Sequence, residues 1–148
     1  MQYGFFYVIN VNKLDPNIKM IRKTVFEDEQ GFIDEFDEID NSDNVVHMLL
    51  CYDDESIGTC RCYKENGEYK IGRVAVLKEY RGKGLGEELV KQAEKKIYEW
   101  GGREVVLSSQ VRVQGFYEKL GYVAEGDVYM DEMCPHIKMR KKLEPSSI

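Results

Sequence analysis

The sequence predicts a single domain of the α/β (α+β) class, with a central mixed, mostly antiparallel sheet of about seven strands flanked by about four helices. An apolar, β-branched run from Ile71 to Leu77 is typical of a buried strand. A glycine-rich turn and an amphipathic helix follow it directly, and short strand patterns with turn signals fill most of the remaining chain. The 148 residues suffice for one sizeable core and contain no linker or repeat, so we expect one domain over residues 1–148.

The first third of the chain combines a strand, a capped helix and an acidic segment. Gln2 to Asn10 is aromatic and β-branched, which predicts the first strand. Asp15 is a good helix cap and Pro16 suits the first helical turn. The inner face of this helix should consist of Ile18, Ile21, Arg22, Val25 and Phe26. We expect a loop or a short second helix from Gly31 to Asn44, anchored by Phe32, Ile33, Phe36 and Ile39.

Two strands, Val45 to Tyr52 and Ile57 to Lys64, should precede the central strand, which the Asn66-Gly67 hairpin turn introduces. In the long helix that follows the glycines, the inner positions are Leu85, Leu89, Ala93, Ile97 and Trp100. Its polar side should carry Glu87, Glu88, Lys91, Glu94 and Lys95, and Gly101-Gly102 should end it. The remaining predicted elements are a strand at Glu104–Ser108, a helix at Val111–Leu120, and strands at Tyr122–Met130 and His136–Lys142.

Composition argues against several classes of function. The net charge of −6 disfavours general nucleic-acid binding. Nine acidic residues and no basic one lie between Glu27 and Asp43; such a segment is usually a solvated loop, and the alternative is that it attracts a cationic amine. No apolar run has membrane-spanning length and no cleavable signal is present, so we expect a cytoplasmic protein without membrane contacts. The four cysteines and two histidines lack the spacing of a zinc site, so no metal is expected.

The stretch from Arg81 to Gly86 favours an anionic ligand. Its three glycines allow backbone N–H groups to turn toward a ligand, and the following helix adds the positive end of its dipole. Neither the P-loop string nor the dinucleotide fingerprint is present, because the last glycine has the wrong spacing for Gly-x-Gly-x-x-Gly. The remaining pattern, Arg-x-x-Gly-x-Gly after a strand, resembles the coenzyme A pyrophosphate loop of the GNAT N-acetyltransferase superfamily.

The resemblance covers nearly the whole chain. The order of the predicted elements is that of the GNAT fold, and Gly115 to Tyr122 is similar to the second signature of the superfamily, in which a tyrosine lies near the cofactor sulfur. Three further strings resemble the ElaA/YjcF-like branch: Arg22 to Gln30, Gly72 to Val76, and Cys134 to Met139. The chain departs from the pattern at Ser108-Ser109-Gln110, where relatives often have asparagine-alanine-glutamine.

The resemblance implies transfer of an acetyl group from acetyl-CoA to a primary amine that attacks the thioester directly. The pantetheine arm would be held by Val74, Ala75, Val76 and Ser109, and the pyrophosphate by Arg81, Gly82, Lys83, Gly84, Leu85 and Gly86. Tyr117 would protonate the leaving thiolate, because a phenol of pKa about 10 is protonated at neutral pH. The candidates for the base are Glu29 and His136, and those for substrate contacts are Gln30, Arg61 and Arg73.

The acceptor is expected to be a small-molecule amine. Alternatives are a protein or peptide acetyltransferase, a non-catalytic acyl-CoA sensor, and a structural partner protein without coenzyme A affinity. An acceptor with a carboxylate or phosphate would suit the arginines, whereas a purely cationic amine would suit the acidic segment. Proteins of this superfamily often form homodimers, which the resemblance implies as an option here.

Overall fold

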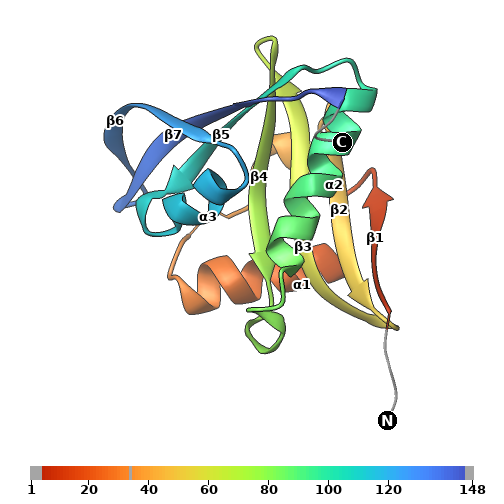
Figure 1. Cartoon of the computed structure of the whole chain (residues 1–148). Helices are drawn as coiled ribbons and strands as arrows, with labels where there is room; N and C mark the ends of the chain where they lie inside the picture. The colour runs from red at the N-terminus through yellow and green to blue at the C-terminus, as the bar shows by residue number, and fades with distance from the viewer. Residues whose placement is uncertain (1–4, 34, 146–148) are drawn as a thin grey trace.

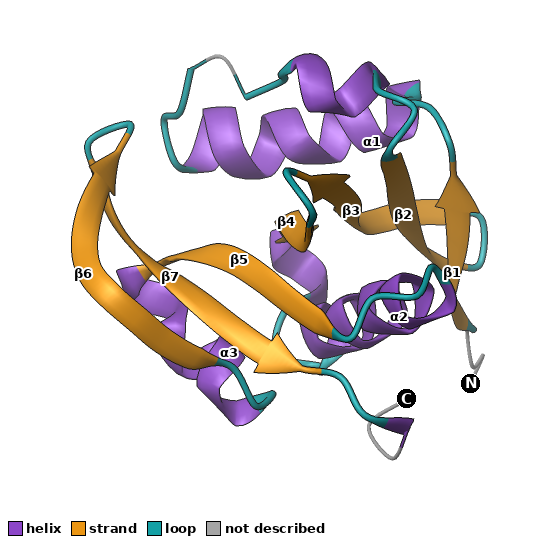
Figure 2. Cartoon of the chain, turned by 90° about the horizontal axis from the view of Figure 1, so that it is seen from above, coloured by secondary structure: helices purple, strands orange, loops and turns teal. Residues whose placement is uncertain are grey.

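The computed structural model describes residues 5–33 and 35–145, which form a twisted seven-stranded sheet with helices on both faces (Figures 1 and 2). The strand order is β1-β2-β3-β4-β5-β7-β6, and every pairing is antiparallel except β4 with β5. The strands are β1 (Phe6–Val11), β2 (Val45–Tyr52), β3 (Glu55–Glu65), β4 (Glu68–Val76), β5 (Glu104–Gln110), β6 (Val123–Asp131) and β7 (Cys134–Lys142). The mixed, mostly antiparallel sheet of the sequence prediction is thereby confirmed.

Three α-helices occur within the described ranges: α1 (Pro16–Arg22), α2 (Leu85–Glu99) and α3 (Gln114–Lys119). α1 continues as a π-helix, η1 (Lys23–Glu29), and short 3-10 turns lie at Glu38–Asn41, Lys78–Tyr80 and Val111–Val113. The Asp15 carboxylate caps α1 by accepting a hydrogen bond from the Ile18 amide at 2.8 Å. None of the helices in the described part of the chain is long and apolar enough to cross a membrane.

The sheet separates two hydrophobic clusters, since successive residues of a strand point to opposite faces. On β2, Met48 and Leu50 pack with α2 and α3, whereas Leu49 and Cys51 pack with α1 and η1. α1 accordingly lies on one side of the sheet and α2 and α3 on the other (Figure 2). The predicted inner faces of α1 and α2 are therefore confirmed, with Ile18 and Ile97 fully buried.

The structure differs from the sequence prediction at several points. β1 begins at Phe6, and the predicted start at Gln2 to Gly4 lies outside the described residues. Ile33 is 73% exposed, so it is no anchor. Glu94, expected on the polar face of α2, is buried because Tyr122 and Lys141 satisfy its carboxylate at 2.7 and 3.0 Å.

Candidate active site

β4 and β5 pair only at Lys70 and Val106 within the described chain, and then diverge (Figure 1). The pairing of β4 with β3 is also irregular between Thr59 and Arg61, where Arg73 has a left-handed backbone with φ of 54°. This conformation is unfavourable for a residue with a side chain, and such bulges bend strands and re-aim side chains. Beyond the bulge, the edge of Val74 to Val76 that faces β5 has no strand partner. A cleft therefore opens between the two strands.

Two adjoining pockets occupy this cleft, and they share Gln30, Val74 and Gln110 among their lining residues. We call the first the histidine pocket; its lining includes Ile71 to Val74, Ser108 to Gln110, Tyr117 and His136. We call the second the loop pocket; its lining includes Val74 to Val76, Glu29, Arg81 and Cys134. The unpaired edge of β4 thus runs from one pocket into the other.

The glycine loop follows β4 directly and leads into α2. Gly82 and Gly84 have φ of 80° and 77°, which is why glycines are needed here, and open space surrounds the position of a Cβ at either. The amides of the first turn of α2 have no partner inside the helix. Lys83, Gly84 and Leu85 line a separate depression beside β1, and Leu85 is also packed in the core.

Arg81 connects the loop to both the strand and η1. Its Nε donates to the Val76 carbonyl at 2.8 Å, and its Nη2 donates to both oxygens of Glu29 at 2.8 and 3.1 Å. The residue predicted to bind pyrophosphate and one candidate for the base therefore form an ion pair with each other.

Tyr117 lies on α3 with 9% of its surface exposed and lines the histidine pocket. Its ring packs edge-on against Phe116 and Tyr122, with centroids 5.0 and 5.7 Å away. Burial raises the pKa of the Tyr117 phenol, with a smaller contribution from Cys60. The phenol is therefore protonated at neutral pH and available as a proton donor.

His136 lies near the start of β7 with 9% of its surface exposed and lines the histidine pocket. Its Nδ1 is 2.8 Å from the backbone oxygen of Cys134. Because a carbonyl oxygen can only accept, Nδ1 carries the hydrogen, and Nε2 of the neutral ring has a free lone pair. The imidazole can thus accept a proton through Nε2. The partner of the ring is the Cys134 carbonyl and not the Cys134 thiol.

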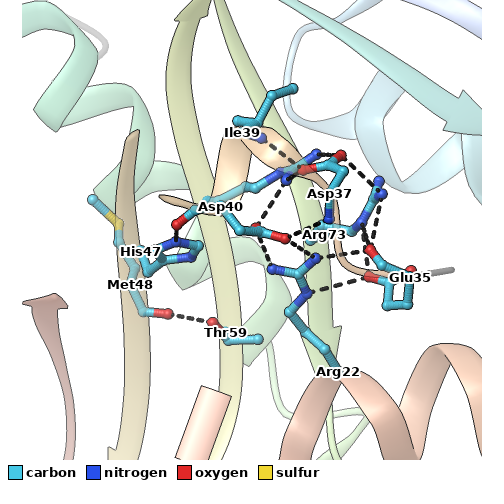
Figure 3. A network of polar contacts seen from close by, with 10 residues as sticks. Arg22, Glu35, Asp37, Ile39, Asp40, His47, Met48, Thr59 and Arg73 are labelled. Carbon is cyan, nitrogen blue, oxygen red and sulfur yellow. Dashed lines mark hydrogen bonds and ion pairs between the residues drawn. The ribbon is translucent and has the colours of Figure 1, made fainter. Parts of the chain in front are cut away.

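Three arginines and three carboxylates form a network of polar contacts, most of which Figure 3 shows: Arg22, Arg61, Arg73, Glu35, Asp37 and Asp40. Glu35 and Arg73 of this network also line the histidine pocket. Arg22 bonds to Asp40 at 2.6 Å and to Glu35 at 3.2 Å, and Arg61 bonds to Asp40 at 2.9 Å. The expectation of a solvated loop in this acidic stretch is wrong here, because Glu35 and Asp40 are buried. The arginines neutralise these carboxylates, which leaves them poorly suited to attract a cationic amine.

The network perturbs the ionisation of its carboxyl groups. Burial raises the pKa of Asp40, but hydrogen bonds from Arg22 and the Asp37 amide outweigh it and bring the pKa to about 2. For Glu35 the balance is opposite: burial dominates over the attraction of Arg73 and Arg22, and the pKa of the carboxyl is raised. Asp40 therefore remains ionised at neutral pH.

Of the predicted substrate contacts, Gln30 and Arg73 lie in the histidine pocket and Arg61 does not. Arg61 is 2% exposed and is held by Asp37 and Asp40, so its place is inside the network. Arg73 is partly exposed, and Glu35 holds its Nε at 2.7 Å. Gln30 accepts a hydrogen bond from Gln110 at 2.9 Å.

The residues predicted to hold the pantetheine arm lie near one another where β4 and β5 separate. Val74 and Ser109 line the histidine pocket from the two sides, and Ala75 and Val76 line the loop pocket. Ser109 is buried, and its hydroxyl donates to the Gln110 carbonyl at 2.8 Å. Sequence reasoning missed Arg112, which lines both pockets and donates from Nε to Gln110 at 2.8 Å. Its position at the start of the predicted helix that follows this strand was the available signal.

A split parallel strand pair, a glycine loop at the start of a helix and a buried tyrosine beside the split match the arrangement that the sequence resemblance implies for an acyltransferase of the GNAT type. Residues 24–143 match the family model described as an acetyltransferase (GNAT) domain. The chain is 33% identical over 123 residues to the uncharacterized N-acetyltransferase YjcF of Bacillus subtilis, over 82% of this chain and 87% of that protein.

Solved structures of GNAT-type proteins have the same fold as this chain. An acyl-CoA N-acyltransferase from Pseudomonas aeruginosa is similar with a TM-score of 0.81 and 27% identity, over 94% of this chain and 99% of that one. Escherichia coli ElaA is similar with a TM-score of 0.78 and 26% identity, over 94% and 99% of the two chains. The chain belongs to the GNAT acetyltransferase family, in its ElaA/YjcF-like branch, and is an acyltransferase.

Proposed function

We propose that this protein transfers an acetyl group from acetyl-CoA to the primary amine of a small molecule. The observation that carries the proposal is the unpaired edge of β4. The glycine loop lies at its C-terminal end, and Tyr117 and His136 line the same cleft. One continuous cleft could thus hold a long cofactor and an acceptor side by side.

The residues of the cleft fit coenzyme A by their chemistry. The backbone groups on the unpaired edge of Val74 to Val76 can bond the amides of the pantetheine arm as a neighbouring strand would, although the Val76 carbonyl already accepts a hydrogen bond from Arg81. Gly82, Gly84 and the first amides of α2 can hold the pyrophosphate, with Arg81 supplying charge. Bound there, acetyl-CoA supplies a thioester whose carbonyl carbon can be attacked by an amine.

Two side chains act as general base and general acid in the transfer. The neutral amine nitrogen forms a bond to the acetyl carbon, and Nε2 of His136 takes the proton that this nitrogen then loses. As the C–S bond breaks, the Tyr117 phenol donates its proton to the leaving sulfur. We favour His136 over Glu29 as the base because Arg81 engages both Glu29 oxygens, whereas Nε2 of His136 has a free lone pair.

The acceptor would lie in the histidine pocket, next to Gln30 and Arg73. Arg73 is already neutralised by Glu35 and Asp37, so we expect it to shape the pocket and to make a polar contact rather than to select an anion. The Nη groups of Arg112 have no partner among the described residues and could bind a negative group of either substrate.

The test begins with calorimetric titration of acetyl-CoA into the protein. We expect micromolar binding that Gly84→Trp abolishes, since the side chain would fill the space above the start of α2. Gly67→Trp is the matched control: Gly67 has a similar φ of 80° and open surroundings, but lies at the opposite end of β4. Equal binding by the wild type and both variants would refute the cofactor site.

Turnover is then measured as thiol release with a panel of small amines and lysine peptides. Tyr117→Phe should lower kcat by roughly 100-fold while the acetyl-CoA affinity stays the same. Binding without thiol release from any amine would instead indicate an acyl-CoA sensor. A clear preference for peptides would indicate a protein acetyltransferase.

A further inference from the structure

Tyr129, on β6, contacts His136 from the neighbouring strand of the sheet. The two residues are register partners, and their rings stack with an interplanar angle of 25° and centroids 6.0 Å apart. The hydroxyl of Tyr129 is hydrogen-bonded to Oγ of Ser108, which lies on β5 and lines the histidine pocket. β7 lies between β5 and β6 (Figure 2), so the hydrogen bond between Tyr129 and Ser108 spans the strand that carries His136.

A bulge in β6 brings Tyr129 to this position. Glu125 is opposite Lys138, so an uninterrupted ladder would place Asp127 opposite His136. The register shifts between Glu125 and Tyr129, where Gly126 has a left-handed φ of 77°, and Tyr129 becomes the partner instead. The bulge thus replaces a carboxylate by an aromatic ring beside the imidazole.

We propose that Tyr129 and Ser108 are positioning residues that hold His136 in the tautomer and orientation needed for a base. This inference rests on the role of His136 in the proposed function. The stacked ring limits rotation of the imidazole, so Nδ1–H keeps its bond to the Cys134 carbonyl and the free lone pair stays on Nε2 of a ring that lines the pocket. Ser108 fixes Tyr129 in turn, which links the pocket wall on β5 to the ring on β6.

The first test is spectroscopic and requires no acceptor. Long-range ¹⁵N–¹H correlation spectra of the intact protein distinguish the two imidazole tautomers. We expect a single Nδ1–H form for wild-type His136, and a mixture of tautomers in Tyr129→Leu, which loses both the stacking and the hydroxyl. Met130→Gln is the matched control, because its side chain follows Tyr129 but points to the opposite face of the strand. An unchanged single tautomer in Tyr129→Leu would overturn the proposal.

The second test is kinetic and isolates the hydroxyl pair. Tyr129→Phe and Ser108→Ala should each lower kcat by roughly five- to tenfold, with acetyl-CoA affinity within about twofold of wild type. Because both remove the same hydrogen bond, the double variant should be no worse than either single one. Additive losses, or a loss of acetyl-CoA affinity, would refute a role through His136.

Kinetics of a His136 variant show whether the proposed base assignment is wrong, independently of the role of Tyr129 and Ser108. If His136→Gln keeps the wild-type kcat, the base assignment is wrong, whereas the tautomer spectra still decide whether Tyr129 and Ser108 orient the ring. If the calorimetric titration shows no binding of acetyl-CoA, the cofactor assignment is wrong, and that result does not depend on His136.

Discussion

Replacing Asp40 by asparagine tests whether the buried ionic network holds the acidic segment in place. Asp40 has no exposed surface and accepts hydrogen bonds from Arg22 at 2.6 and 3.1 Å, from Arg61 at 2.9 Å and from the Asp37 amide at 3.0 Å. Asparagine keeps the size of the side chain but removes its charge. Its NH₂ group would also face N–H donors of the two arginines.

The structure sets the size of the expected effect. The pKa of Asp40 is lowered from 3.8 to about 2, which corresponds to about 2 kcal/mol of stabilisation at neutral pH. The same interactions can be judged from buried ion pairs, whose disruption typically costs about 3–5 kcal/mol; the lower end applies here because Arg22 keeps Glu35 and Arg61 keeps Asp37 as anionic partners. We therefore expect Asp40→Asn to lower the free energy of unfolding by about 3 kcal/mol.

Urea unfolding followed by the fluorescence of Trp100, the single tryptophan, measures this loss. Asp28→Asn is the matched control, since Asp28 pairs with Lys23 while their side chains are 58% and 61% exposed. Asp28→Asn should lower the free energy of unfolding by at most about 1 kcal/mol. If Asp40→Asn costs no more than this control, the network is not a major source of stability and our reasoning is refuted.

Two further predictions follow from other ion pairs and from burial. Glu29→Gln should tighten acetyl-CoA binding by roughly two- to fivefold in calorimetry, since Glu29 competes for Arg81. The control Glu65→Gln, which breaks the pair with Lys70 at the other end of β4, should leave the affinity unchanged, and weaker binding by Glu29→Gln would contradict competition. Burial lowers the pKa of His47 below 6.5, so its stabilising contribution is present above about pH 6.5 and is lost as the pH falls. The urea midpoint should therefore drop between pH 7.5 and 5.5 in the wild type and less in His47→Gln; equal drops would exclude His47 as a cause.

Much of the fold was predictable because it depends on local patterns. β2 has the predicted bounds, Val45 to Tyr52, since an uninterrupted apolar run between turn signals leaves little choice. Asn66 and Gly67 have the left-handed φ of 53° and 80° that the turn prediction requires. The helix after the glycines likewise begins at Leu85, where its apolar repeat begins.

The acidic segment shows where sequence reasoning fails. Its charge pattern indicated solvent exposure, yet Glu35 and Asp40 are buried by arginines from α1, β3 and β4. These partners are distant in sequence, and only the packing of α1 against the sheet brings them together. Arg61 is inside the network for the same reason, although its type and position suggested a substrate contact.

The sequence by itself determined the order of the elements, the glycine loop and the family, because propensities and motifs are local. Only the tertiary structure decided how the site is assembled. It separates β4 from β5 beyond Lys70, pairs Glu29 with Arg81, and brings Tyr129 beside His136 through a bulge. Such contacts depend on sheet register and chain crossing, and no short stretch of sequence encodes either of them.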